Sequence, residues 1–344
     1  MRRTMRCFGT VFAVCLSLTG AHAQTSTKPL IKIVATGGTI ANSPSGRMSI
    51  DSVLQKIPQL AEVADIEVFD FARVGSSSVS VQNWLDLGNA INKIFREEPG
   101  VTGIVVTHGS NTSEETSYFL SLMTEGNKPV VVTGAQRQQN TLGEEGSRNL
   151  LDAVKVAAWP GAQGKGVLLV VNEMIHAARD VTKRISSRIE TWDSGDLGVL
   201  GLVDKDQVTF YRTPTYKHTA TSDLRLSALT QANQLPRVDI LYSYADADGA
   251  LIDAAVAAGA KGLVMAGFAT GSATPSQRKA LQAAQAKGIA VAMSHRGGLG
   301  RVDTLDTPYI TADNLTPQKA RILLMLGLAK TSDVEELKRL LQTH

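Results

Sequence analysis

The feature that most constrains the fold is a regular alternation of short apolar runs with longer amphipathic segments. The apolar runs are typical of buried strands, and the segments between them are typical of helices. Strands that alternate with helices form a mostly parallel sheet with helices on both faces. In the first part of the chain, the predicted strands are 30–35, 66–71, 103–107, 129–133 and 167–171, and the predicted helices are 81–95, 114–123 and 147–158.

A second alternating block follows a polar stretch, which predicts two α/β domains. The polar stretch has few apolar periodic positions and ends at a proline, as a linker does. We therefore expect a larger N-terminal domain over 24–212, a linker over 213–236 and a smaller C-terminal domain over 237–344, each a mostly parallel sheet covered by helices. The strands predicted in the second domain are 238–242, 262–266 and 289–293, and its helices are 251–258, 277–287 and 317–326.

Residues 1–23 have the pattern of a secretory signal peptide. Three arginines precede an apolar stretch from Cys7 to Gly20, and Ala21-His22-Ala23 is a small-x-small cleavage site. The apolar stretch is short for an uncleaved membrane anchor, which is the alternative. The pattern predicts a mature chain that begins at Gln24 in the periplasm.

Removal of that segment changes what the composition implies. Both cysteines and three arginines lie inside it, so the mature chain has no thiol and carries 32 basic against 32 acidic residues. A disulfide framework and a thiolate metal site are excluded. A balanced charge gives no reason to expect nucleic acid or an anionic membrane as a partner.

Small polar residues follow two of the predicted strands. Thr36-Gly37-Gly38-Thr39 comes after the first strand, where two glycines allow a sharp turn that presents Thr39 at the carboxyl edge of the sheet. The stretch 105–115, VVTHGSNTSEE, presents Ser110 and Asn111 at a second strand-to-helix turn. Thr112 and Glu115 have the spacing of a capping box. Either turn could be only structural.

Lys183 is a candidate proton acceptor near these hydroxyls. It lies in Ala178-Arg179-Asp180-Val181-Thr182-Lys183, after the strand at 167–171. Burial disfavours the charged form of a lysine and therefore lowers its pKa. The alternative is a solvated surface lysine, which is the commoner case. The histidines show no ligand spacing, so no metal is expected.

Five motifs in order resemble the bacterial type II L-asparaginases and glutaminase-asparaginases. The resemblance runs from about Ile31 to the C-terminus and spans both predicted domains. The motifs are IVATGGTIA (33–41), VVTHGSNTSEETSYFL (105–120), ARDVTK (178–183), YRTPTYKHT (211–219) and LTPQKARILL (315–324).

The resemblance implies a homotetramer of intimate dimers, with the active site at the dimer interface and no cofactor. Thr39 matches the nucleophile that attacks the side-chain amide, and Ser110 and Lys183 match the hydroxyl and lysine that relay protons. Ser76 matches the position that binds the substrate α-carboxylate. The substrate-binding positions implied in this way are Gly38, Gly75, Ser76, Ser77, Gly109, Asn111 and Ala135.

The sequence departs from the family at several pocket positions. Asn111 stands where the family has an aspartate that pairs with the substrate α-ammonium, so this bond is expected to weaken by roughly 1 to 3 kcal/mol. The loop 42–48 lacks the family's assisting tyrosine. Arg301 aligns with a glutamate that reaches the ammonium across the dimer, and Ser272 aligns with an amide-bearing asparagine.

Three functions remain open from the sequence. The first is hydrolysis of L-asparagine, with L-glutamine as a second substrate. The second is the same chemistry on a small amide that lacks a free α-ammonium, because the pocket has exchanged carboxylates for neutral or positive groups. The third is a periplasmic relative that only binds its ligand. A threonine beside a lysine favours a hydrolase, since pure binding needs no nucleophile.

Overall fold

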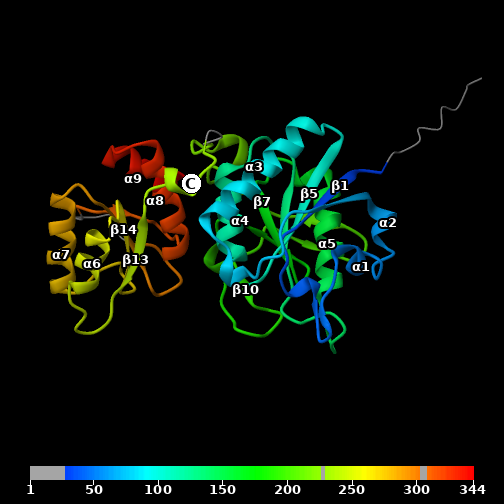
Figure 1. The fold of residues 1–344 in the computed structure, drawn as a ribbon, viewed down its shortest axis with the longest axis horizontal. Coiled ribbons are helices and arrows are strands. Elements are labelled where there is room, and N and C mark those ends of the chain that lie inside the picture. The colour runs from blue at the N-terminus through cyan, green and yellow to red at the C-terminus, as the bar shows by residue number, and fades with distance from the viewer. Residues whose placement is uncertain (1–27, 226–228, 303–307) are drawn as a thin grey trace, which may run out of the picture.

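The computed structural model describes residues 28–225, 229–302 and 308–344, and folds them into two α/β domains that lie side by side (Figure 1). The signal peptide predicted over 1–23 lies outside these residues. In the described residues, every helix is too short or too polar to cross a membrane.

An eight-stranded sheet forms the centre of the larger domain. Its strand order is β12-β11-β8-β7-β6-β5-β1-β4, and the five strands from β7 to β4 are parallel. The last three at the other edge are antiparallel to their neighbours. The strands are β1 (Leu30–Ala35), β4 (Asp65–Asp70), β5 (Val101–Thr107), β6 (Val130–Thr133), β7 (Val167–Val171), β8 (Met174–Ala177), β11 (Gly201–Val203) and β12 (Val208–Phe210).

Helices cover both faces of this sheet, which confirms the predicted architecture. Along β1, Ile33 packs into the core beneath α5, while Val34 packs on the opposite face with α3 and α4. Strands buried on both faces are read from the sequence as continuous apolar runs. The helices are α1 (Ile50–Leu54), α2 (Leu60–Val63), α3 (Val81–Glu97), α4 (Ser113–Met123) and α5 (Gly146–Ala158).

The smaller domain has a four-stranded parallel sheet in the order β13-β14-β15-β16. Helix α8 packs on this sheet and also contacts α4 of the larger domain, so the two domains share a core that includes Phe119 and Leu323. The elements are β13 (Val238–Tyr242), β14 (Gly262–Gly267), β15 (Ala290–His295), β16 (Ile310–Thr311), α6 (Ala250–Ala257), α7 (Pro275–Ala286), α8 (Pro317–Lys330) and α9 (Val334–Thr343).

Short elements complete the described chain. Two small hairpins are formed by β2 (Asn42–Ser43) with β3 (Gly46–Arg47) and by β9 (Thr182–Lys183) with β10 (Trp192–Asp193). The 3-10 turns are η1 (Thr39–Ala41), η2 (Ser76–Ser78), η3 (Pro160–Ala162), η4 (Gly195–Leu197), η5 (Thr219–Thr221) and η6 (Ala232–Gln234). The last two lie in the stretch predicted as a linker, where Leu224 is fully buried between the domains.

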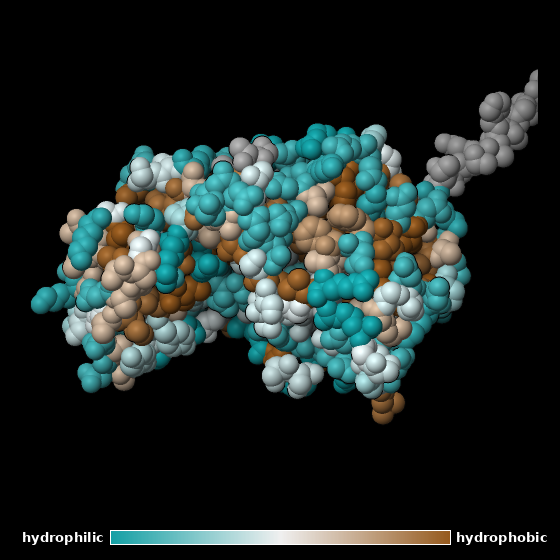
Figure 2. All heavy atoms as spheres, in the orientation of Figure 1, coloured by the Kyte–Doolittle hydropathy of each residue, from teal (hydrophilic) through white to brown (hydrophobic). Residues whose placement is uncertain are grey.

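Apolar side chains reach the surface on the smaller domain. Figure 2 shows brown surface over its elements, and Ile240, Tyr242 and Leu251 are among its exposed large side chains. Exposed apolar side chains that gather on one domain favour a face that a partner can cover.

Candidate active site

The two glycine-containing turns predicted from the sequence touch each other through their backbones. Strands β1 and β5 are parallel neighbours, so both turns lie at the same edge of the sheet. Gly38 has φ of 95°, and a Cβ on it would lie 2.5 Å from the backbone nitrogen of Gly109. Only glycine satisfies both conditions. This contact brings the turn that carries Thr39 next to the turn that carries Ser110.

The η2 turn is attached to the second of these turns. The Ser76 hydroxyl accepts a hydrogen bond from the Asn111 backbone N–H at 3.2 Å, and a Cβ on Gly109 would lie 2.6 Å from the same oxygen. Ser76 is buried, whereas its neighbours Gly75 and Ser77 are exposed. Three predicted binding positions therefore meet at one point of the sheet edge.

The capping box predicted at Thr112 and Glu115 is wrong. Thr112 is the residue before α4, but its side chain does not cap the helix. Its hydroxyl instead donates to the Ser76 carbonyl at 2.8 Å. The Thr112 hydroxyl therefore bonds a residue distant in the chain instead of a backbone N–H in the first turn of α4. It joins the η2 turn to the turn before α4.

Lys183 and Ser110 are in direct contact. The Lys183 Nζ lies 2.8 Å from the Ser110 Oγ, although 73 positions separate the two residues. Ser110 is 7% exposed, and Lys183 is half-buried. Burial lowers the pKa of Lys183, and the nearby Glu114 carboxylate partly opposes that effect. The pair therefore has the geometry of a hydroxyl and its proton acceptor.

The segment that carries Lys183 is held by groups that the sequence did not identify. The Glu114 carboxylate accepts the Lys183 backbone N–H at 2.7 Å. Lys319, which is 1% exposed and lies on α8 of the smaller domain, donates through Nζ to the carbonyls of Arg179 and Val181. These contacts fix the backbone on both sides of Thr182, so the freedom that remains at Lys183 is in its side chain.

Gln136 is a third side chain in contact with the pair. Its Oε1 lies 3.2 Å from the Lys183 Nζ and 3.3 Å from the Ser110 Oγ. It comes directly after Ala135, which the sequence placed in the turn after the strand now seen as β6. That neighbour was the available signal, but nothing in a single glutamine indicates a contact with a lysine 47 positions away.

Thr39 is the first residue of η1 and is half-buried. Among the described residues its hydroxyl has no hydrogen-bond partner, so no competing acceptor or donor occupies it. A hydroxyl nucleophile needs such access, together with a base that can receive its proton.

Two more pocket predictions can be placed. The Asn111 side chain is exposed and forms no hydrogen bond to any described residue, which leaves its amide open to a substrate. Ala135 is fully buried, and its Cβ lies 3.2 Å from the position that a Cβ on Gly146 would take. Ala135 therefore faces α5 with its side chain, and no part of this predicted binding residue is exposed at the surface.

The two predicted residues of the smaller domain bond partners outside this cluster. The Arg301 Nε donates to Asp313 at 2.9 Å, and its side chain is 65% exposed. The Ser272 hydroxyl is 3.0 Å from that of Thr270. Within the described residues of one chain, neither Arg301 nor Ser272 forms a hydrogen bond or ion pair with Thr39, Ser110 or Lys183.

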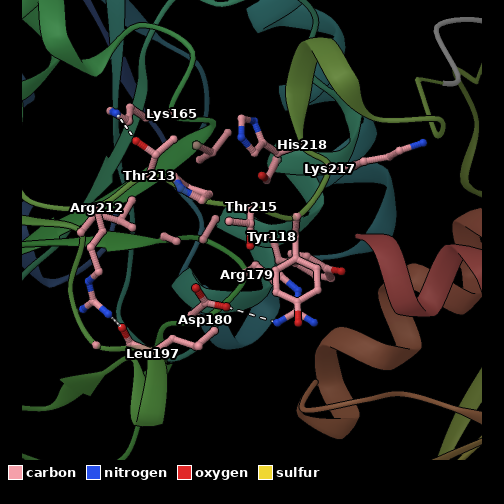
Figure 3. A pocket seen from close by; sticks show the side chains of 18 residues that line it. Tyr118, Lys165, Arg179, Asp180, Leu197, Arg212, Thr213, Thr215, Lys217 and His218 are labelled. Atoms are coloured by element: carbon pink, nitrogen blue, oxygen red, sulfur yellow. Dashed lines mark hydrogen bonds and ion pairs between the residues drawn. The ribbon is translucent and has the colours of Figure 1, made fainter.

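A cavity of about 290 Å³ lies between α4 and the segment after β12 (Figure 3). It is lined by Tyr118, Lys165, Arg179 and His218 among others, and by none of the predicted catalytic residues. Among its lining residues, Arg212 donates to the Leu197 carbonyl, and Lys165 donates to the Thr213 hydroxyl.

In residues 28–225, 229–302 and 308–344, no three His, Cys, Asp or Glu side chains gather as metal ligands would.

The chain is similar to known asparaginases along nearly its whole length. A family model described as Asparaginase, N-terminal matches residues 30–216, and one described as Glutaminase/Asparaginase C-terminal domain matches residues 237–341. The chain is 39% identical over 324 residues to L-asparaginase 2 of Bacillus subtilis, covering 90% of this chain and 85% of the relative. It is 34% identical to a probable periplasmic L-asparaginase of Haemophilus influenzae, covering 97% of each. A solved probable cytoplasmic L-asparaginase from Campylobacter jejuni matches with a TM-score of 0.88 and 38% identity, covering 92% of this chain and 100% of that one.

Proposed function

Because the chain belongs to the asparaginase family, we propose that it hydrolyses the side-chain amide of L-asparagine to L-aspartate and ammonia, with L-glutamine as a second substrate. The observation that carries the proposal is the 2.8 Å contact between the Lys183 Nζ and the Ser110 Oγ, beside the turn that presents Thr39. A binding protein has no need for this arrangement.

In the proposed reaction, the Thr39 hydroxyl attacks the amide carbon while Ser110 receives its proton and passes its own to neutral Lys183. The tetrahedral intermediate expels ammonia, which leaves with a proton from the same relay, and an acyl-enzyme forms on Thr39. A water then attacks the ester, and the relay returns the threonine to its hydroxyl form. Lys183 must be neutral to accept the first proton, and burial favours that form.

We assign recognition of the substrate α-carboxylate to the turn Gly75-Ser76-Ser77, which is fixed to the Asn111 backbone. The exposed Asn111 amide is then the group that meets the α-ammonium. A neutral oxygen still accepts a hydrogen bond from a cation, but less strongly than a carboxylate does. This substitution favours a second candidate, an amide that lacks a free α-ammonium.

The test is ammonia release by the purified protein from L-asparagine, L-glutamine and succinamate, the last of which lacks the α-amino group. Thr39→Ala is the control that removes the nucleophile. Fastest turnover of L-asparagine, abolished by Thr39→Ala, supports the proposal. Faster turnover of succinamate supports the second candidate, and ligand binding without turnover in either protein would leave only a binding role.

We propose that Arg301 and Ser272 act across an interface in a homotetramer, because neither meets the catalytic cluster of its own chain and the smaller domain exposes apolar side chains. Analytical ultracentrifugation gives the mass of the assembly. The KM of the Arg301→Ala variant tests whether Arg301 contributes to substrate binding. A protein that is fully active as a monomer would exclude this part of the proposal.

We also propose export with removal of residues 1–23, which the arginines and the small-x-small site support. The relatives differ in this respect, since one is named periplasmic and another cytoplasmic. N-terminal sequencing of protein from a periplasmic fraction tests the cleavage.

We expect activity to survive EDTA, because the proposed chemistry uses no metal or other cofactor.

A further inference from the structure

The side chain of Gln136 joins the two groups of the proposed proton relay. Its Oε1 accepts from the Lys183 Nζ at 3.2 Å and from the Ser110 Oγ at 3.3 Å. Lysine and serine are themselves 2.8 Å apart. The three polar groups therefore form a closed triangle, in which one oxygen can accept from both of the others.

The orientation of this amide is fixed from two other sides. Its Nε2 donates to the Arg188 carbonyl at 3.4 Å, which directs Oε1 and not the NH₂ group toward the lysine. The backbone N–H groups of Gln136 and Arg137 both donate to the Glu145 carboxylate just before α5, the latter at 3.3 Å. Both the backbone and the amide plane are thus held while the oxygen faces the cation.

We propose that Gln136 is a positioning residue of the relay. When Lys183 takes up a proton, the side-chain oxygen of Gln136 accepts a hydrogen bond from the ammonium group and holds it in place beside Ser110. This inference rests on the proposed function, in which Lys183 is the final proton acceptor. Nothing is transferred to Gln136 itself, and the amide is unchanged at the end of each turnover.

The physical effect of the contact has a definite sign. A hydrogen-bond acceptor stabilises an ammonium more than a neutral amine, so Gln136 opposes the burial that favours the neutral form of Lys183. Loss of the acceptor shifts the lysine further toward its neutral form. A carboxylate at the same place shifts it in the opposite direction.

The charged groups around the lysine bond other partners, although the nearby Glu114 carboxylate still raises the pKa of Lys183. Glu114 on α4 bonds the Lys183 backbone N–H, and Glu145 bonds the backbone of Gln136. Asp193 on β10, the strand paired with β9, forms an ion pair with Arg184 at 2.8 Å. Among the described residues, only Ser110 and Gln136 bond the Lys183 Nζ directly.

The test compares Gln136→Met and Gln136→Glu with the same changes at Gln138, which is exposed two positions away and whose side chain bonds no described residue. The first readout is the acid limb of the pH profile of kcat/KM for L-asparagine, which follows deprotonation of Lys183. Gln136→Met is expected to move it to lower pH and Gln136→Glu to higher pH, each by a roughly three- to tenfold change in the protonation equilibrium. Both Gln138 variants are expected to leave it unchanged.

The second readout is the titration of Lys183 by NMR in protein with labelled lysine side chains, assigned by its loss in Lys183→Met. It does not depend on turnover, so it distinguishes failure of this inference from failure of the proposed hydrolysis. Opposite shifts in the two Gln136 variants support the role. Shifts of the same sign, or shifts equal to those of the Gln138 controls, would overturn it, because a purely structural effect does not reverse between loss of the acceptor and its replacement by a carboxylate.

Discussion

Replacement of the buried Lys319 by methionine gives a prediction whose size and sign can both be worked from the structure. The Lys319 Nζ donates to the carbonyls of Arg179 and Val181, and methionine can donate to neither. A buried carbonyl left without a partner costs about 1 to 3 kcal/mol, so the two together cost about 2 to 6 kcal/mol of unfolding free energy. Methionine fills a similar volume, so no large cavity adds to this.

A second effect opposes the first below about pH 8. Burial lowers the pKa of Lys319 from its ordinary value of 10.5 to about 8. At pH 7 both the folded and unfolded chains carry the proton, and the folded protein bears the full cost of a buried charge, roughly 3 kcal/mol. Lys319→Met removes that cost. Between pH 8 and 10.5 the unfolded chain holds a proton that the folded chain has released, so wild-type stability gains from this group as pH rises.

The variant is therefore expected to lose little stability at pH 7 and more at pH 10. The difference in unfolding free energy between wild type and Lys319→Met is expected to grow by about 2 to 3 kcal/mol over this interval. Urea unfolding at both pH values measures it, with Lys279→Met as the matched control, because Lys279 lies on α7 and is exposed. A difference that stays constant or shrinks as pH rises would refute the reasoning, because it would mean that Lys319 does not lose its proton on folding.

Three further substitutions probe single contacts. Gly38→Ala is expected to lower the unfolding free energy by about 3 kcal/mol or more, seen as a fall in Tm, because its Cβ would collide with the Gly109 backbone at positive φ. Asn111→Asp is expected to lower KM for L-asparagine about ten- to a hundredfold but not KM for succinamate, and equal changes in steady-state KM would contradict its assignment to the α-ammonium. Tyr118→Phe removes a buried hydroxyl that has no hydrogen-bond partner among the described residues, so urea unfolding is expected to show a change within about 1 kcal/mol or a gain.

The sequence predicts the buried strands well because their signal is local. The predicted strands 30–35, 167–171 and 238–242 coincide with β1, β7 and β13, since apolar residues dominate each of them, with Lys32 and Asp239 the only charged residues inside. The sequence does not predict the antiparallel strands β11 and β12 at one end of the sheet. Each has three residues, too few to show a period, and their pairing depends on neighbours distant in the chain.

The residues of the candidate site also fall into two groups, those that the sequence predicts and those that only the structure reveals. Thr39, Ser110 and Lys183 lie in motifs that can be recognised along the chain, whereas the groups that hold them are visible only in three dimensions. Glu114 reaches the Lys183 backbone across 69 positions, and Lys319 reaches Val181 across 138. No local pattern distinguishes such residues from a helix-capping acid and a surface lysine, which are the usual interpretations of their positions.

The contacts of α8 imply that the smaller domain contributes to the site within one chain as well as through any interface. Lys319 bonds the backbone before Lys183, and its neighbour Gln318 donates to Glu114 at 3.2 Å. Glu114 in turn accepts a hydrogen bond from the Lys183 backbone N–H. Two neighbouring residues of α8 therefore hold the backbone around Lys183, Lys319 directly and Gln318 through Glu114. In the proposed relay, Lys183 alternates between charged and neutral forms, and a fixed backbone keeps its Nζ within reach of Ser110 in both forms. The shared core that joins α4 to α8 is therefore a requirement of the proposed chemistry and not only of the fold.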